Sequence, residues 1–204
     1  DGNKNKFSGK VNSSPFNSKI LLEGPLKKYK AGESSSSYIV SYKNSYLNKS
    51  APIFYPNVND GILPYSFSDL YSKLSFNSAK GSGLSVFGFN YSDAVDFPNS
   101  TSYNWKSRGL GTKFLLIPEG SKTIIDGSVT FSNYLIQQIE LDSRPRESGI
   151  NGYNVNLNFS RFVNESDKVK YGLEMNGFRT DFEFYNSLNR KISQNENPSE
   201  INAF

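Results

Sequence analysis

The stretch that decides the fold is LPYSFSDLYSKLSF, NSAKGSG and LSVFGFNYSD, which together cover residues 63–93. In the first run, Leu70 and Leu74 lie at even positions and alternate with Asp69 and Lys73 at odd ones. Side chains that alternate with a period of two point to opposite sides of a β-strand. The run therefore predicts a strand with a different environment on each side.

A second strand follows directly. The Gly-rich segment 77–83 has the composition of a turn, and Phe87, Phe89 and Tyr91 then share one phase. We predict a β-hairpin whose two faces differ moderately, because the polar phase contains Tyr71 and the apolar phase Ser72. Both a soluble β-sandwich and a transmembrane β-barrel contain such strands, since barrel strands alternate lipid-facing apolar with lumen-facing polar residues.

The same alternation recurs along the whole chain, and no helical period of 3.6 is convincing. It is clearest in 152–163, where Tyr153, Val155, Leu157 and Phe159 alternate with asparagines and a serine. We count nine strands and the start of a tenth at 199–204. The remaining predicted strands lie within 7–14, 18–26, 38–47, 104–117, 123–141 and 169–185.

The predicted connections alternate in length. Short polar turns at 27–35, 78–83, 119–122 and 164–167 alternate with mostly longer loops at 48–66, 94–103, 142–149 and 189–198. Outer-membrane barrels have short turns at one end and long loops at the other. Several predicted strands exceed ten residues, whereas strands of soluble sheets average about 5–6 and about 9–11 tilted residues cross a bilayer. Both features favour a barrel over a sandwich.

Composition narrows the class of protein further. The chain has 204 residues with 16 Phe and 13 Tyr, and its mean hydropathy is −0.56. Such polarity is compatible with a β-barrel, because half of each strand and all loops are polar. The longest aliphatic or aromatic run is 114–117, and a transmembrane helix needs about 20 apolar residues. Helical membrane spans are excluded.

The sequence contains no Cys and no His, which removes thiol and Ser/His nucleophiles and the usual zinc and haem ligands. The net charge is +4, but the basic runs at 4–6 and 27–30 are short. We interpret them as solvated surface and expect no nucleic-acid partner. We also expect no catalytic residue, no cofactor and no metal site. The spacing of the candidate carboxylates marks no acid/base pair: Asp69, Asp93, Asp126, Glu140 and Glu174.

Two further sets of residues are candidates for a role at the surface. Aromatic residues near strand ends are interpreted as a girdle at the membrane–water interface, with ordinary strand-end packing as the alternative. They are Tyr65, Phe67, Tyr103, Trp105, Tyr153, Phe184 and Tyr185. A ligand would first meet residues on or near the long loops, although such residues are more often merely solvated. These are Tyr55, Trp105, Arg108, Arg144 and Arg146.

Several short sequence segments resemble, in order and spacing, the start of a TonB-dependent outer-membrane receptor barrel: EGPL at 23–26, SYKNSYL at 41–47, and LPY with DLYSKL at 63–74. The opening residues 1–9 look like the point where that family's plug domain ends and its first barrel strand begins. Residues 84–93 and the surroundings of Trp105 continue the likeness, whereas the later half matches only as generic barrel. Lys43 departs from the family pattern, which usually has Arg at this position. Lysine keeps the positive charge but cannot make the bidentate contact of arginine.

The resemblance implies a closed transmembrane barrel of 22 antiparallel up-and-down strands, an internal plug and a TonB-binding segment. We expect residues 1–204 to form one partial β-barrel domain, the first nine to ten strands after the plug, with no second domain. The family's function would be uptake of a scarce nutrient (a metal chelate, cobalamin, glycan or peptide) across a Gram-negative outer membrane. Its partners are the membrane, the rest of the barrel and plug, and the TonB complex. A surface lipoprotein caps some relatives, but no residue here argues for one. The sequence does not identify the ligand or its contacts.

Two alternatives remain open. One is a small complete barrel of eight or ten strands, whose terminal aromatic residue would be Phe204. The alternate positions before it are Asn202, Glu200 and Pro198, which do not form an apolar series, so we interpret Phe204 as a truncation point. The other alternative is a secreted or surface β-sandwich that binds glycans or mediates adhesion.

Overall fold

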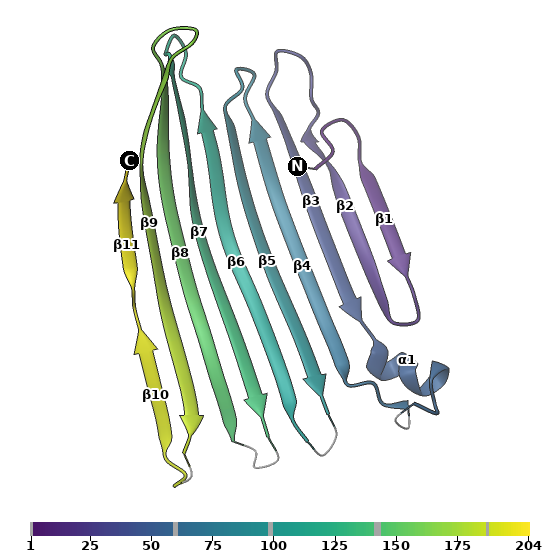
Figure 1. Ribbon diagram of the computed structural model, residues 1–204. Helices are drawn as coiled ribbons and strands as arrows, with labels where there is room; N and C mark the ends of the chain where they lie inside the picture. Colours follow the sequence, from purple (N-terminus) through teal and green to yellow (C-terminus); the bar gives the residue numbers. More distant parts are fainter. Residues whose placement is uncertain (1, 59–60, 98–99, 141–143, 187) are drawn as a thin grey trace.

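The computed structural model describes residues 2–58, 61–97, 100–140, 144–186 and 188–204. They form eleven β-strands in a single antiparallel sheet and one short helix, α1 (Leu47–Phe54). From β1 to β10 each strand pairs with the next one along the chain (Figure 1). The strands are β1 (Ser8–Ser13), β2 (Asn17–Lys27), β3 (Ser35–Ser45), β4 (Tyr65–Asn77), β5 (Gly83–Asp96), β6 (Ser102–Leu116), β7 (Thr123–Ile139), β8 (Pro145–Phe162), β9 (Lys168–Tyr185), β10 (Lys191–Glu196) and β11 (Ser199–Ala203).

The prediction of an all-β, up-and-down antiparallel architecture is confirmed. The hairpin predicted from residues 63–93 is β4–β5, in register from Tyr65 opposite Val95 to Asn77 opposite Gly83. The sheet does not close on itself: among the described residues, β1 pairs only with β2, and the opposite edge is formed by β10 and β11.

Strands β10 and β11 occupy the same edge of the sheet. β10 pairs with one half of β9 and β11 with the other half, and Pro198 lies between them. The backbone N–H of Phe178 donates to the carbonyl of Pro198 over 2.9 Å. A proline is tolerated at this position because an edge strand has one unpaired side. The sheet thus has ten strand positions, which matches the predicted nine strands and the start of a tenth.

One predicted loop was therefore wrong. Residues 189–198 contain β10, whose sequence KISQNE has little apolar alternation. Its residues are exposed throughout, so no buried face imposes the period of two on which the prediction relied. Pairing with β9 alone holds this segment in the sheet.

The predicted difference in connection length is also only partly present. The four turns are confirmed at 28–34, 78–82, 117–122 and 163–167, and we call their end of the sheet the turn end. At the opposite, loop end, the connections are 14–16, 46–64, 97–101, 140–144 and 186–190, of which only 46–64 is long. Strands β5, β6 and β8 extend into segments that were predicted as loops. Parts of those predicted loops, 59–60, 98–99 and 142–143, lie outside the described residues.

The long connection contains α1, which the sequence did not predict. The segment LNKSAPIF includes Pro52 and is too short to display a helical period. Tyr46 ties the start of α1 to the β1–β2 turn, because its hydroxyl donates to the carbonyl of Ser14 and, over 3.1 Å, to that of Asn17. The helix contacts β4 and covers only the corner of the sheet (Figure 1).

The register gives the sheet two continuous faces. Val155 on β8 pairs with Val129 on β7 and with Met175 on β9, and directly paired residues project to the same side. We call this side the apolar face. It also carries Tyr38, Val40, Leu70, Leu74, Phe76, Leu84, Val86, Leu110, Phe114, Phe131, Leu157 and Leu173. The opposite side, the polar face, carries Lys43, Asp69, Lys73, Asp126, Asn154, Asn156, Asn158 and Glu174.

Phe87 and Phe89 lie on the polar face, opposite Lys73 and Tyr71. Their rings cover Gly111 and Gly109 of β6, where an added Cβ atom would come within 2.6 Å of each ring. An aromatic side chain packed over a glycine of the neighbouring strand compensates for the packing that the glycine lacks. These phenylalanines thus serve contacts between strands, which explains their occurrence among polar neighbours.

Neither face of the sheet is covered by a second layer of described residues. Ala51 in α1 is the only hydrophobic side chain in the described part of the chain that is buried. The protein exposes 13397 Å² of surface, whereas a compact monomer of 22.9 kDa is expected to expose about 9,600 Å². The described residues therefore form a single-layer wall without a hydrophobic core of its own.

Candidate functional site

Hydrogen bonds connect the side chains of the polar face across β7, β8 and β9. The amide nitrogen of Asn154 donates to Asn176 Oδ1 over 2.6 Å and to Glu174 Oε1 over 3.2 Å. Parallel contacts join Asn156 to Ser128 Oγ (2.7 Å) and Asn158 to Asp126 Oδ2 (3.0 Å). Asn156 also donates to Asn154 Oδ1 over 3.3 Å, so these two asparagines of β8 belong to one network, and Asn158 with Asp126 forms a separate pair beside it.

The apolar face ends at a straight row of polar side chains, which we call the polar row. Each member pairs directly with the next on the neighbouring strand, and Asn133 Nδ2 donates to Asn151 Oδ1 over 2.8 Å. Nearer the loop end, this side of the sheet stays largely hydrophilic, with Gln137 donating to Glu147. The polar row consists of Asn90, Arg108, Asn133, Asn151 and Arg179.

Beyond the polar row, most aromatic residues of the strands lie on the opposite side, the polar face. Tyr103 and Trp105 stack with ring centroids 5.6 Å apart, and Phe182 lies 5.4 Å from Phe184. The residues of this loop-end aromatic cluster are Tyr65, Phe67, Tyr91, Tyr103, Trp105, Tyr134, Phe182 and Phe184.

This location corrects the girdle interpretation. An interfacial girdle of a barrel shares the outward face with the apolar band. Of the seven residues predicted for it, only Tyr153 and Tyr185 lie on the apolar face, and the other five belong to the loop-end aromatic cluster. Position near a strand end was the signal used, but it does not reveal to which side a ring projects.

Two adjoining hollows at the loop end of the polar face form the candidate site. The first, of about 530 Å³, is lined by Trp105, Tyr134 and Val95 together with Tyr91 and Asp93. Tyr91 and Asp93 also line the second hollow, of about 340 Å³. The remaining residues that line the second hollow are Lys19, Ser41, Lys43, Asp69 and Tyr71.

The two hollows offer different chemistry side by side. The first presents aromatic rings, and the second brings two lysines and two aspartates together. Lys43 is held in place by Phe67, whose ring centroid lies 4.3 Å from the ammonium nitrogen, a cation–π contact. Aromatic surface beside convergent polar groups is typical of sites that bind small molecules. We call the two hollows together the loop-end site.

The structure brings only one of the predicted ligand-contact residues to this site, namely Trp105. Arg108 lies on the opposite face in the polar row. Arg146 pairs with Glu140 over 2.8 Å, Tyr55 stacks on Phe16 at 5.7 Å, and Arg144 precedes β8.

Of the candidate carboxylates, Asp69 and Asp93 lie together in the second hollow. Asp126, Glu140 and Glu174 each bind another side chain elsewhere on the sheet. Sequence reasoning missed Tyr91 and Tyr134, which lie in one row through Ser107. Only the register between strands reveals that row.

Residues 2–5 lie against the polar face at the turn end. A Cβ atom on Gly2 would come within 2.0 Å of the carbonyl oxygen of Tyr38, whose side chain projects to the apolar face. Lys4 and Asn5 share a hollow with Ser35 and Asn77. The chain therefore reaches its first strand from the polar side of the sheet.

No protein-family model matches the chain, and no curated protein matches it. The described residues contain no helix with the length and hydropathy of a transmembrane span.

Proposed function

We propose that this chain is a segment of the wall of an outer-membrane β-barrel, the N-terminal part of a TonB-dependent receptor. The observation that carries the proposal is that one uncovered sheet has two unlike sides. One is a hydrogen-bonded polar face, and the other is the apolar part of the apolar face between the polar row and the turn end, which we call the apolar band. Leu110, Phe131 and Leu173 are 61%, 51% and 55% exposed. Burying such side chains is worth roughly 25 cal/mol per Å² of apolar surface, and the acyl chains of a bilayer would provide that burial.

The dimensions of the apolar band are compatible with this assignment. In β6 it runs from Leu110 to Leu116 and in β8 from Tyr153 to Phe159, about 20 Å along the strand at 3.3 Å per residue. Barrel strands tilt by about 35–45°, so this length spans about 14–16 Å of height, within the band of about 25 Å that barrel exteriors carry. The polar row bounds the band at the loop end, and Lys27 and Arg161 lie at its turn end.

The open edges support a segment rather than a complete barrel. Within the described part of the chain, β1 and the β10–β11 edge each have one side without a strand partner. Unpaired backbone groups cost several kcal/mol each in hydrocarbon. Further strands, absent from these 204 residues, would close the wall in the proposed 22-stranded barrel.

The orientation follows from the two ends of the sheet. In bacterial barrels, turns face the periplasm and long loops face outward. The loop end, with residues 46–64 and strands that continue past the polar row, would then project outside the cell. The loop-end site would form part of the surface that meets an incoming nutrient, and the plug would occupy the polar side, from which residues 2–5 approach.

These 204 residues contain no cysteine, which allows a direct test once every cysteine elsewhere in the full-length protein is replaced by serine. Single cysteines at Leu157 and Leu173 on the apolar face, with matched controls at Asn156 and Glu174, can be spin-labelled in the full-length protein in lipid vesicles. We expect the first two labels to collide with membrane-dissolved oxygen, and the two controls to collide with a water-soluble nickel complex. Equal access of the nickel complex to all four would overturn the proposal.

The same experiment separates the alternatives. A β-sandwich would cover Leu157 and Leu173 with protein, so their labels would be shielded from both reagents, and the protein would stay monomeric without detergent. A small complete barrel would give the membrane pattern from residues 1–204 alone, whereas a segment of a larger barrel would need the rest of the chain.

A further inference from the structure

The apolar face contains a groove at the turn end that the proposed transport function does not use. It is an open groove of about 710 Å³ between β2 and β6. Its floor follows one row of the sheet in which Lys27 pairs with Ser36, Ser36 with Phe76, Phe76 with Leu84, and Leu84 with Phe114. The groove is thus apolar along most of its length, with a cation and hydroxyl groups at one end.

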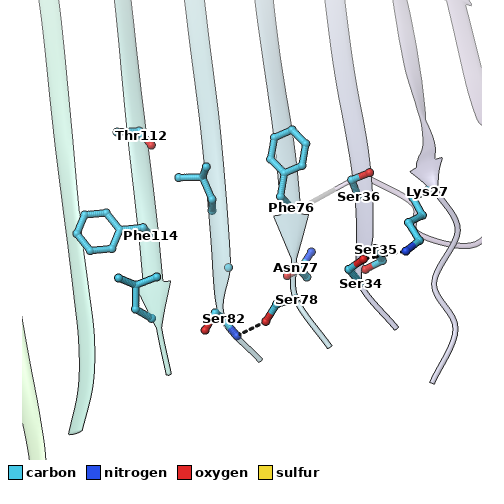
Figure 2. A pocket seen from close by; sticks show the side chains of 13 residues that line it. Lys27, Ser34, Ser35, Ser36, Phe76, Asn77, Ser78, Ser82, Thr112 and Phe114 are labelled. Carbon is cyan, nitrogen blue, oxygen red and sulfur yellow. Dashed lines mark hydrogen bonds between the residues drawn. The ribbon is translucent and has the colours of Figure 1, made fainter. Parts of the chain in front are cut away.

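Figure 2 shows this division. Phe76 and Phe114 project from β4 and β6, while Lys27 and the serines 34–36 gather at the far side. A ligand that fits must carry a long apolar part and one polar, anionic end. A phospholipid has this composition.

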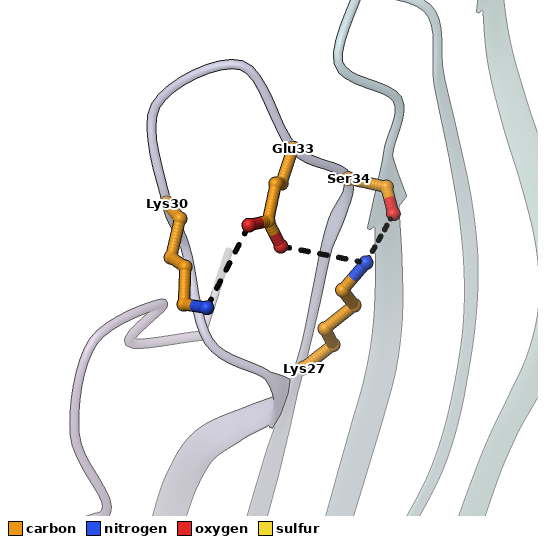
Figure 3. A network of polar contacts seen from close by, with 4 residues as sticks. All are labelled: Lys27, Lys30, Glu33 and Ser34. Carbon is orange, nitrogen blue, oxygen red and sulfur yellow. Dashed lines mark hydrogen bonds and ion pairs between the residues drawn. The ribbon is translucent and has the colours of Figure 1, made fainter.

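The charge at the polar end is not fully neutralised by the protein. Lys27 donates to Ser34 Oγ over 2.8 Å and lies 4.0 Å from a carboxylate oxygen of Glu33 (Figure 3). Lys30 lies 3.6 Å from the other oxygen of the same carboxylate. Two ammonium groups share one carboxylate, and exposed ion pairs of this kind are weak, so positive charge remains for a phosphate.

The surroundings have the same sign. In the four turns, Lys28, Lys30, Lys80 and Lys122 balance four carboxylates. The three strand residues on each side of every turn add Lys27 and Arg161 on the apolar face, Lys168 and Lys170 on the polar face, and no carboxylate. On the apolar face, the ends of the strands are therefore basic where the apolar band stops, at the level where lipid headgroups would lie.

From the groove and this charge we infer a binding site for an anionic phospholipid, with its phosphate at Lys27 and an acyl chain along Phe76, Leu84 and Phe114. This inference rests on the proposed function, because it requires the apolar face to meet a bilayer. The site would hold one lipid in the leaflet at the turn end and would fix the height of β2–β6 in the membrane.

Tryptophan fluorescence provides the test, because the only tryptophan of these 204 residues, Trp105, lies on the polar face. In full-length protein in which Trp105 and every tryptophan outside these residues are replaced by phenylalanine, Phe114→Trp places a reporter in the groove. Leu157→Trp is the matched control, since residues 114 and 157 belong to one row through Gly127. Leu116→Trp is a second groove reporter, in case residue 114 does not tolerate the larger ring.

The probes are vesicles in which either phosphatidylglycerol or phosphatidylcholine carries brominated, quenching chains. We expect phosphatidylglycerol to be enriched about fivefold at the groove, as for one lysine at an anionic surface, and not at residue 157. Lys27→Ala should abolish the enrichment. Lys28→Ala, at the next residue along the chain but not lining the groove, should retain it.

Each other result has a defined meaning. Equal enrichment at residues 114 and 157, or equal loss with both lysine variants, would indicate general attraction by a basic surface and overturn the specific site. Quenching of both reporters without enrichment would leave the barrel proposal intact and refute this inference. Absence of quenching at both residues would refute the barrel proposal itself.

Discussion

The ring of Tyr153 on β8 lies over Gly177 on β9, so that a Cβ atom at residue 177 would come within 2.2 Å of the ring. Both residues lie on the apolar face, where Phe114 makes the same contact over Gly127: a Cβ atom at residue 127 would come within 2.6 Å of its ring. In a single-layer sheet, such contacts replace part of the packing that a second layer would provide. We therefore expect them to contribute to stability although the rings are partly exposed.

Gly177→Ala should lower the free energy of unfolding by about 1 kcal/mol, towards the low end of the cost of overpacking, because the tip of the Tyr153 ring can move aside. Gly88→Ala is the matched control in the same row of the sheet. Its Cβ atom would meet its nearest neighbours only at 3.5 Å and beyond. It should be neutral or slightly stabilising, since glycine is unfavourable in strands. Urea unfolding of both variants in the same lipid or detergent tests this difference, and equal effects would contradict it.

The sequence was sufficient to predict strands, because the alternation of apolar and polar residues, as from Tyr153 to Phe159, indicates that the two faces of a strand lie in different environments. It failed where no such contrast exists, as in the edge segment Lys191–Glu196 and in α1. The loop-end site could not be predicted for a different reason. Tyr91 and Tyr134 lie in one row only through Ser107 on the strand between them, and the sequence does not specify which residues of neighbouring strands pair. The polar row was missed for the same reason.

Replacing Leu157 by arginine tests whether the apolar face meets lipid. An arginine on the lipid side of a barrel costs about 2–4 kcal/mol at the bilayer midplane. Leu157→Arg should therefore lower the stability of the protein in vesicles by that amount. Asn156→Arg, one residue earlier and on the polar face, should cost much less, mainly through the lost bond to Ser128. If the two variants unfold at the same urea concentration, the apolar face does not meet lipid and the polar face water as proposed.

Asn154 is the centre of the hydrogen-bonded polar face, because it donates to both Asn176 and Glu174. Asn154→Ala leaves two acceptors without this donor and should cost about 1–2 kcal/mol, since hydrogen bonds to charged groups exceed the usual 0.5–1.5. Asn133→Ala removes one neutral bond, to Asn151, and should cost about 1 kcal/mol or less. Unfolding measurements that rank the two variants in the reverse order would show that the contacts of Asn154 are replaced by water.

The environment of Trp105 distinguishes the loop-end site from an interfacial girdle. Trp105 lines the first hollow with Tyr134 and Asp93 on the polar face, so in vesicles its fluorescence should be quenched by aqueous acrylamide and not by brominated lipid chains. A tryptophan in a girdle would show the opposite response, because girdle rings lie at the headgroup level on the outward face. Tyr153→Trp in a Trp105→Phe background provides the comparison, since residue 153 lies on the apolar face next to the polar row. Lipid quenching of Trp105 would remove it from the loop-end site and restore the girdle, whereas acrylamide quenching that declines when a small molecule is added would identify that molecule as a ligand of the site.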